Sequence, residues 1–350
     1  MSRQSASKSS KSSGSQAEQT LTQENFEREL KKLAEKAQGE TLLKWALKQG
    51  RILFQIGAIY FLAATYSNVS VLNLSPVYGT IPSRRLHSQG VWASCFLGWS
   101  LNIFLRKWLS VRPQQSLPLI AAHIPLIHFY LFKYSDLLGA SYGPLLTESL
   151  TFFPLLIIST AAAANLLNEL EFDCNWIQNW ISDSLPGIFS YTFFRAMELL
   201  SAKQIQNTIG NSVMQTRLGL QIVLISAYSI LFPSKILIYI LPAVLHLALY
   251  NTHVPSSYAD SLLRTSLENK GWSLLERRES LTGYISVLEN HEQKFRAIRC
   301  DHSILGGEWL SYVNNLGIAE PIYSVFVMLE AVRLVELKKP ILDFEANAYV

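Results

Sequence analysis

Residues 52–74 read ILFQIGAIYFLAATYSNVSVLNL, without one Asp, Glu, Lys or Arg. A transmembrane helix needs roughly 20 mostly apolar residues, because the hydrocarbon core of a bilayer is about 30 Å thick and each helical residue rises 1.5 Å. The stretch is long enough to cross a membrane. Similar uncharged apolar runs follow at 86–105, 117–132, 149–167, 218–232 and 236–250. So many runs in 51–250 predict a mainly α protein: a polytopic α-helical membrane bundle with the lipid bilayer as its partner.

Residues 185–200 decide whether this bundle has six or seven spans. The segment is apolar except for Arg195 and Glu198, an i,i+3 pair whose side chains can meet on one side of a helix. A charge at mid-bilayer costs roughly 2.5–3.5 kcal/mol on insertion scales, so such residues usually face a bundle interior. We favour a spanning helix with an intramembrane charge pair over an interfacial helix. A transport site at Arg195 and Glu198 is the sharper hypothesis, and a structural charge pair is the simpler one.

The apolar runs also contain three histidines, His123, His128 and His246. A substrate path or proton path could use them, but isolated histidines in such segments are more often hydrogen-bonded structural residues. Their spacing matches no metal-binding motif. We therefore predict no metal site in this chain.

The composition excludes some functions and places the polar segments at the ends. Charged residues make up 16% of the chain, against about 25% in soluble proteins, and the shortfall lies between residues 51 and 250. The net charge of +4 is too small to indicate a nucleic-acid partner. Cys95, Cys174 and Cys300 lie far apart, so no disulfide framework is indicated.

The polar ends suggest the division into domains. We expect a disordered Ser-rich tail, an amphipathic juxtamembrane helix, a transmembrane helical domain, a connector and a partial C-terminal domain. Their predicted limits are 1–19, 20–50, 51–250, 251–271 and 272–350.

The hydrophobic period changes from helix to strand after residue 272. Residues 283–289 and 295–300 alternate apolar and polar side chains, which predicts a β-hairpin joined through 290–294. Residues 320–335 have helical spacing with Pro321 in the first turn, and 346–350 look like the start of another strand. The prediction for this end of the chain is a short α/β tail, with a hairpin and a helix at the start of a Rossmann-like domain.

Three motifs in this tail resemble the spermidine synthase family of polyamine aminopropyltransferases, and most closely its fungal multi-pass membrane members. They are ESLTGYISV at 279–287, RCDHSILGGEW at 299–309 and EPIY at 320–323. In that family a small domain of β-hairpins precedes a Rossmann-like domain. The resemblance covers about a fifth of the chain and implies a transferase that acts in polyamine biosynthesis or related adenosylmethionine chemistry.

The resemblance also implies site residues. Glu320 and Tyr323 match the acid and tyrosine of the family's D-E-x-x-Y element near the nucleoside and amine pocket, although Ala319 replaces the first acid. Asp301 matches an aspartate at the end of a strand. Substrate binding is therefore assigned to Asp301, Glu320 and Tyr323, and no catalytic residue is assigned.

The family's donor, decarboxylated S-adenosylmethionine, is bound by a glycine-rich turn after the first Rossmann strand. The sequence ends at Val350, where that strand would begin. We therefore expect no cofactor site and an incomplete enzyme in this chain, with a polyamine or adenosyl ligand only in a longer form.

Two other interpretations remain open at this stage. One is a non-enzymatic membrane scaffold or transporter component with a vestigial tail, and the other is an incomplete reading frame near Asn347. Membrane proteins of this class favour the endoplasmic reticulum or another internal membrane. The sequence gives no oligomeric state.

Overall fold

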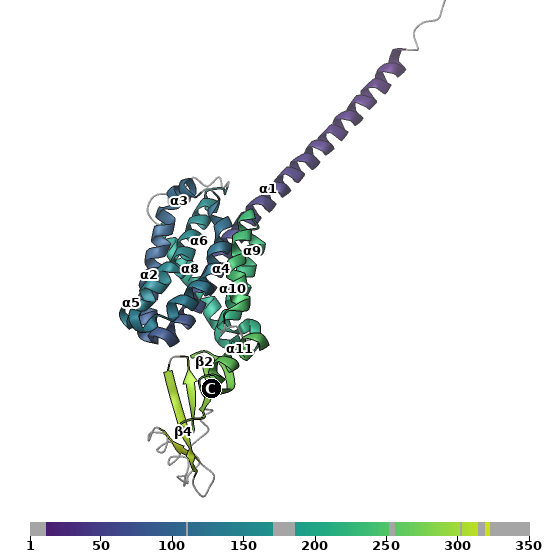
Figure 1. The fold of residues 1–350 in the computed structure, drawn as a ribbon. Helices are drawn as coiled ribbons and strands as arrows, with labels where there is room; N and C mark the ends of the chain where they lie inside the picture. The colour runs from purple at the N-terminus through teal and green to yellow at the C-terminus, as the bar shows by residue number, and fades with distance from the viewer. Residues whose placement is uncertain are drawn as a thin grey trace, which may run out of the picture.

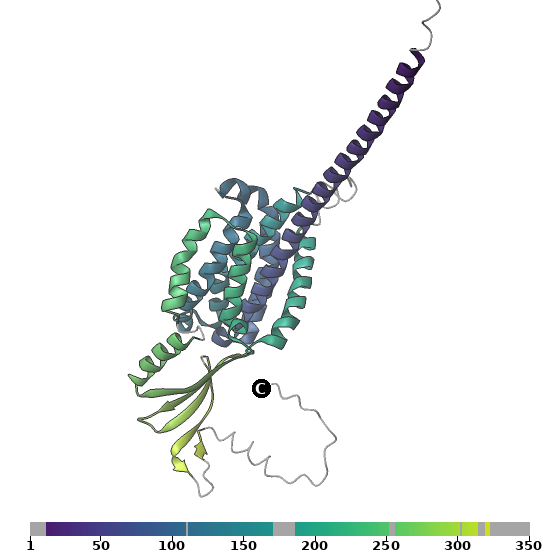
Figure 2. The same ribbon diagram turned by 90° about the vertical axis from the view of Figure 1, so that its right-hand side faces the viewer.

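The computed structural model describes residues 12–109, 111–170, 186–251, 256–301, 303–313 and 319–322. It shows a bundle of helices with a β-sheet at one end and the first half of helix α1 projecting from the other end (Figures 1 and 2).

The helical part contains α1 (Ser12–Tyr78), α2 (Thr80–Ser100), α3 (Asn102–Trp108), α4 (Pro113–Phe132), α5 (Ser135–Leu150), α6 (Phe152–Leu167), α8 (Pro186–Thr208), the 3₁₀ helix η1 (Val213–Gln215), α9 (Arg217–Leu231), the 3₁₀ helix η2 (Lys235–Ile240), α10 (Leu241–Leu249) and α11 (Ser257–Glu268). The sheet contains β1 (Trp272–Ser280), β2 (Gly283–Asn290), β3 (Phe295–Cys300), β4 (Ser303–Val313) and β5 (Ala319–Pro321).

The core of the bundle forms around the second half of α1. Ile59, Tyr66 and Val69 of this helix are fully buried and pack in one cluster with apolar side chains of α2, α4, α6, α8 and α9. Helices α2 and α6 approach closely at Gly98, where a Cβ atom would collide with the carbonyl oxygen of Ile157. A glycine at this crossing lets the two backbones pack without a gap.

The predicted six-to-seven-span bundle is not what the structure shows. Among the described residues, two helical segments are long and apolar enough to cross a membrane, Thr41–Tyr78 and Pro113–Phe132. The pair Ser135–Leu150 and Phe152–Leu167, which is bent by 40°, adds a third if it counts as one broken span.

The physical reason is that an uncharged run need not be one long helix. Helix α9 has 15 residues and α6 has 16, so each is roughly 23 Å long and shorter than the hydrocarbon core. The run 86–105 is divided at Leu101, and the run 236–250 is divided into η2 and the nine-residue α10.

Helix α1 passes through two of the expected domain limits. It begins at Ser12, within the segment expected to be a disordered tail, and continues without a break past residue 50. The connector expected at 251–271 contains α11.

The C-terminal unit is an antiparallel sheet in the order β1-β2-β3-β4-β5. The predicted hairpin is present as β2 and β3, with Asn290 opposite Phe295. The expectation of an α/β tail is wrong for the described residues: Ala319–Pro321, where the helix should begin, is strand β5 paired with β4. Tertiary pairing overrides the local helical spacing there. Residues 323–335 and the strand expected at 346–350 lie outside the described residues.

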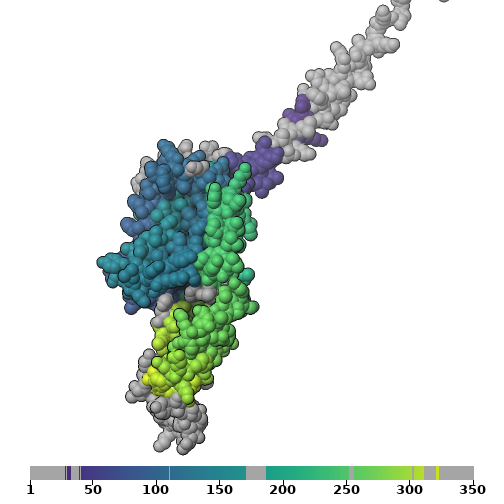
Figure 3. Space-filling view, viewed as in Figure 1, coloured from purple at the N-terminus to yellow at the C-terminus, as the bar shows by residue number. Residues whose placement is uncertain are grey.

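The sheet is joined to the bundle by α9, α10 and α11, which run along one side of the molecule to the sheet (Figure 3). Arg277 of β1 donates a hydrogen bond to Asp260 of α11 at 2.6 Å, and Arg264 of α11 donates to the Leu274 carbonyl, also at 2.6 Å. The first residue of α9, Arg217, makes the most extensive connection.

Candidate functional site

Arg217 links the helical bundle to two strands of the sheet. Its Nε donates to Glu279 Oε1 on β1, and one terminal nitrogen donates to Asp301 Oδ2, just after β3, at 3.0 Å. The other terminal nitrogen donates to the Leu72 carbonyl of α1 at 3.3 Å. The three ionised side chains are 6%, 2% and 12% exposed, respectively, so they interact away from bulk water. We call Arg217, Glu279 and Asp301 the junction triad.

The backbone around Asp301 is shaped to present its carboxylate to Arg217. Asp301 has a φ of 46°, and its Oδ2 also accepts a hydrogen bond from the Tyr284 backbone N–H at 3.1 Å. Gly283 precedes that amide with a φ of 144°, and a Cβ atom there would collide with Asp301 Oδ2. Only glycine satisfies both the torsion angle and the close approach.

Tyr284 covers the guanidinium groups from the sheet side. The Arg217 guanidinium lies 5.0 Å from the centre of the Tyr284 ring, and that of Arg277 lies 5.1 Å from it. Such contacts attract a cation to the ring face. They add to the ion pairs that hold the sheet against the bundle.

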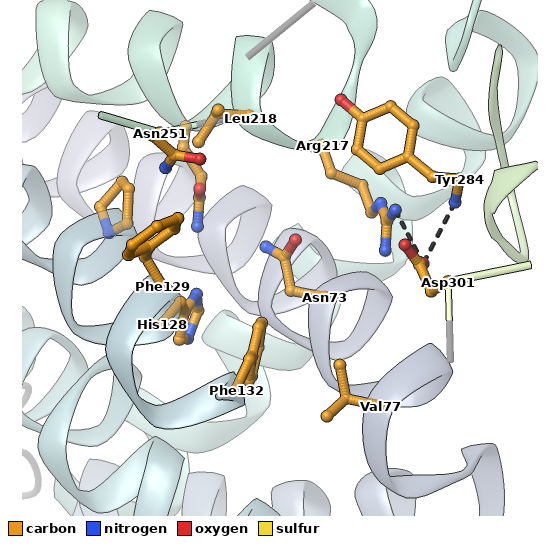
Figure 4. Close-up of a pocket in the computed structure, with 12 residues that line it drawn as sticks. Asn73, Val77, His128, Phe129, Phe132, Arg217, Leu218, Asn251, Tyr284 and Asp301 are labelled. Atoms are coloured by element: carbon orange, nitrogen blue, oxygen red, sulfur yellow. Dashed lines mark hydrogen bonds and ion pairs between the residues drawn. The ribbon is translucent and has the colours of Figure 1, made fainter. Parts of the chain in front are cut away.

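Arg217 and Asp301 of the junction triad border a cavity of about 70 Å³, which we call the junction pocket (Figure 4). Residues of α1, α4, α9, β2 and the end of β3 line it: Asn73, Val77, Pro125, His128, Phe129, Phe132, Arg217, Leu218, Gln221, Asn251, Tyr284 and Asp301. Figure 4 shows Arg217, Tyr284 and Asp301 at one end and His128 and Phe129 toward the other.

Two side-chain nitrogens of the pocket lining are buried and have no hydrogen-bond partner among the described residues. They are Asn73 Nδ2 and His128 Nε2. Buried polar atoms are nearly always paired, and an unpaired one costs about 1–3 kcal/mol. The pocket therefore offers polar groups to a guest.

The electrostatic balance of the junction triad is negative. The carboxylates of Glu279 and Asp301 share the single charge of Arg217. Burial raises the pKa of Glu279 above its ordinary value; Arg217 opposes this rise and Asp301 adds to it. The junction is therefore a favourable place for an added cationic group.

The predicted substrate-binding residues do not come together among the described residues. Asp301 lies in the junction triad, but Glu320 is in β5 opposite Trp309 on the far side of β4. Tyr323 lies outside the described residues.

The predicted pair of Arg195 and Glu198 is present on α8 and forms an ion pair. Glu198 also accepts a hydrogen bond from Ser67 at 2.5 Å, and Ser67 contacts His87 Nε2 at 2.7 Å, while His87 Nδ1 pairs with Glu148. If Ser67 donates its proton to Glu198, both ring nitrogens of His87 donate, and the ring is an imidazolium. Two cations then balance two carboxylates in a buried network that joins α1, α2, α5 and α8.

Sequence reasoning missed most of the junction pocket. Arg217 stands as a lone charge before an apolar run, and His128 resembles any structural histidine in a hydrophobic helix. Their joint position depends on packing between elements far apart in the chain. The available signals were the ESLTGYISV motif, which contains Glu279, Gly283 and Tyr284, and the RCDHSILGGEW motif, which contains Asp301.

One curated relative is similar in sequence to most of this chain. The N-terminal histidine N-methyltransferase of Emericella nidulans is 36% identical over 298 residues, which cover 84% of this chain and 53% of that protein. The chain therefore spans about half the length of the curated relative it matches. No family model matches the chain, and no solved structure matches it.

This similarity corrects the expected family and function. It points to methyl transfer, so the assignment to spermidine synthase-like aminopropyltransferases and to polyamine biosynthesis is wrong. The similarity does not support the scaffold or transporter interpretation either. The described residues of the three motifs lie in strands of the sheet and in the turns next to them, where they position side chains without encoding which chemical group is transferred.

Proposed function

We propose that this chain contributes to an N-terminal histidine N-methyltransferase, which adds a methyl group to a nitrogen of a histidine at the start of a polypeptide. The observation that carries the proposal is the 36% identity over 84% of the chain. A match of that length includes most of the helical domain, so the similarity is not limited to the sheet.

Methyl transfer to a histidine nitrogen places chemical requirements on the acceptor and on the donor. The accepting nitrogen must have a free lone pair, so an imidazolium or ammonium loses its proton before it takes the methyl group. A donor of the S-adenosylmethionine class supplies a methyl group whose carbon–sulfur bond breaks with the electron pair left on sulfur.

The described cavities do not fit such a donor. The junction pocket, at about 70 Å³, is far below the roughly 300–1,000 Å³ of sites that enclose whole cofactors. A second cavity of about 550 Å³ is lined mostly by apolar side chains of α4 and its neighbours and has no carboxylate for ribose hydroxyls. We therefore propose that the described residues bind the polypeptide that accepts the methyl group. None of them is assigned to binding the methyl donor.

The proposal is tested in the organism that carries the gene. Deletion of the locus should remove methylation from N-terminal histidines, measured by mass spectrometry of protein N-termini, and reintroduction of the intact gene should restore it. Methylated internal histidines in the same samples serve as the control and should not change. Unchanged methylation of N-terminal histidines in the deletion strain would reject the proposed function.

A membrane location belongs to the same proposal. Thr41–Tyr78 and Pro113–Phe132 can cross a bilayer by length and composition, and apolar side chains near the start of the first segment are exposed, including Leu42, Leu47 and Phe54. We expect the protein to stay in the membrane pellet after extraction with alkaline carbonate. Its release into the supernatant would contradict a membrane-embedded location.

A further inference from the structure

We propose that the junction pocket is the acceptor subsite, which takes the imidazole of an N-terminal histidine and places its free α-ammonium against Asp301. The inference rests on the proposed function and goes beyond it, because it assigns the acceptor to particular side chains.

The charge of the junction triad carries the first part of the argument. A free N-terminus has a pKa of about 7.7–8.0 and is largely cationic at neutral pH, whereas the backbone nitrogen of an internal histidine is an uncharged amide. Asp301 uses Oδ2 for both of its hydrogen bonds, to Arg217 and to the Tyr284 amide. Its Oδ1 is engaged in neither of these bonds and is the atom we assign to the incoming ammonium. An added cation also balances the second carboxylate of the triad.

Buried side-chain nitrogens without a hydrogen-bond partner among the described residues favour an imidazole as the guest of the pocket. His128 is 4% exposed, and its Nε2 lies in the pocket lining without a partner among the described residues. Asn73 provides a second such nitrogen. An imidazole has two ring nitrogens that form hydrogen bonds, so it can pair with groups of this kind where an apolar side chain could not.

The volume of the junction pocket also suits a single small ring. A cavity of about 150 Å³ holds a benzene molecule, so a partly open space of about 70 Å³ suits at most one small ring. Aromatic rings of Phe129 and Phe132 on α4 and of Tyr284 on β2 border this space and supply flat apolar walls. These features together select a terminal residue with one small polar ring and a free amine.

The buried network around His87 is a weaker candidate for the same role. Its two cations and two carboxylates balance, so an incoming ammonium would meet no excess negative charge. Its four charged side chains already contact one another across the helices α2, α5 and α8.

Binding to the purified full chain in mild detergent tests the inference. The probe is a fluorescent peptide that begins with histidine, compared with the N-acetylated peptide and with a peptide that begins with alanine. The protein variants are His128→Phe, Asp301→Asn and the matched control His123→Phe. His123 is on the same helix but lines the other cavity.

We expect the histidine peptide to bind. The N-acetylated peptide loses its ammonium and the alanine peptide loses its imidazole, so each should bind roughly tenfold or more weakly, as the loss of a hydrogen bond in the pocket predicts. His128→Phe and Asp301→Asn should weaken binding similarly, and His123→Phe should leave it unchanged. The comparison of peptides needs no protein variant, so it remains informative if Asp301→Asn fails to fold.

Two results would overturn the acceptor assignment while the proposed function stands. In the first, the peptide binds, and neither His128→Phe nor N-acetylation of the peptide changes its affinity. In the second, the purified chain does not bind the peptide, although deletion of the gene still removes methylation from N-terminal histidines. If the peptide binds in the pocket but deletion leaves methylation unchanged, the proposed function fails and the acceptor assignment fails with it.

Discussion

Replacing Arg217 with methionine removes a cation that links the helical bundle to both β1 and the end of β3. The change leaves the carboxylates of Glu279 and Asp301 buried without their shared partner. Removing one member of a buried ion pair typically costs about 3–5 kcal/mol, because the remaining charge is uncompensated. The Leu72 carbonyl also loses a donor. We therefore expect about 3–5 kcal/mol of lost stability, seen as a fall of several degrees in the melting temperature.

The matched control is Arg278→Met, the same substitution on the same strand. Arg278 is 82% exposed and pairs with Glu276, which is also exposed, so its loss should cost less than about 1 kcal/mol. Thermal unfolding followed by tryptophan fluorescence compares the two variants in one detergent. A second comparison adds Glu279→Gln and Asp301→Asn to Arg217→Met, which should recover part of the loss because no buried charge remains.

Equal melting temperatures for Arg217→Met and Arg278→Met would refute this reasoning. They would mean that the buried ion pairs do not hold the sheet against the bundle. A triple variant less stable than Arg217→Met would likewise contradict the role assigned to uncompensated charge.

Three further predictions concern the junction and the bundle. Gly283→Ala should cost about 1–3 kcal/mol, because its φ of 144° is strained for alanine and the new Cβ meets Asp301; faster limited proteolysis between sheet and bundle measures it. His87→Ala should cost about 3–5 kcal/mol by leaving the buried Glu148 carboxylate without its ion-pair partner, whereas the exposed His291→Ala should be near neutral in thermal unfolding. Because burial raises the pKa of Glu279, the folded state binds that proton more tightly than the unfolded chain, so stability should fall as the pH rises from about 4.5; Glu279→Gln should remove this part of the slope in melting temperatures measured from pH 4 to 8.

The sequence predicted the hairpin of β2 and β3 because a period of two is a local signal. The two strands pair in the antiparallel register of a hairpin, and the loop that joins them starts at Asn290, whose side chain accepts a hydrogen bond from the Gln293 amide at 2.8 Å. The sequence also predicted that Arg195 and Glu198 meet, since residues three apart on a helix are neighbours.

The number of spans could not be obtained in the same way. Apolar composition reports burial, but it does not distinguish burial in lipid from burial against other helices. The run 149–167 shows this: Leu155, Leu156 and Ala162 are fully buried inside the protein, and the helix that carries them has only 16 residues. Where a helix ends depends on breaks such as Leu101 and Thr151, which have no marked sequence signal.

The junction pocket was beyond prediction for a related reason. Asn73 and Asp301 are separated by most of the chain, and only the packing of the sheet against α1 and α9 brings them to one cavity. The chemistry was misassigned because the quoted motifs describe the sheet that positions Asp301. They do not indicate a chemical reaction.

The most direct test of this account is complementation of the deletion strain with three alleles: the unaltered gene, His128→Phe and the matched control His123→Phe. The readout is the methylated fraction of N-terminal histidines, normalised to the amount of protein present. We predict that the unaltered gene and His123→Phe restore methylation and that His128→Phe restores at most roughly a tenth of it, as the loss of one acceptor contact implies. Full restoration by His128→Phe, or no restoration by the unaltered gene, would contradict the account.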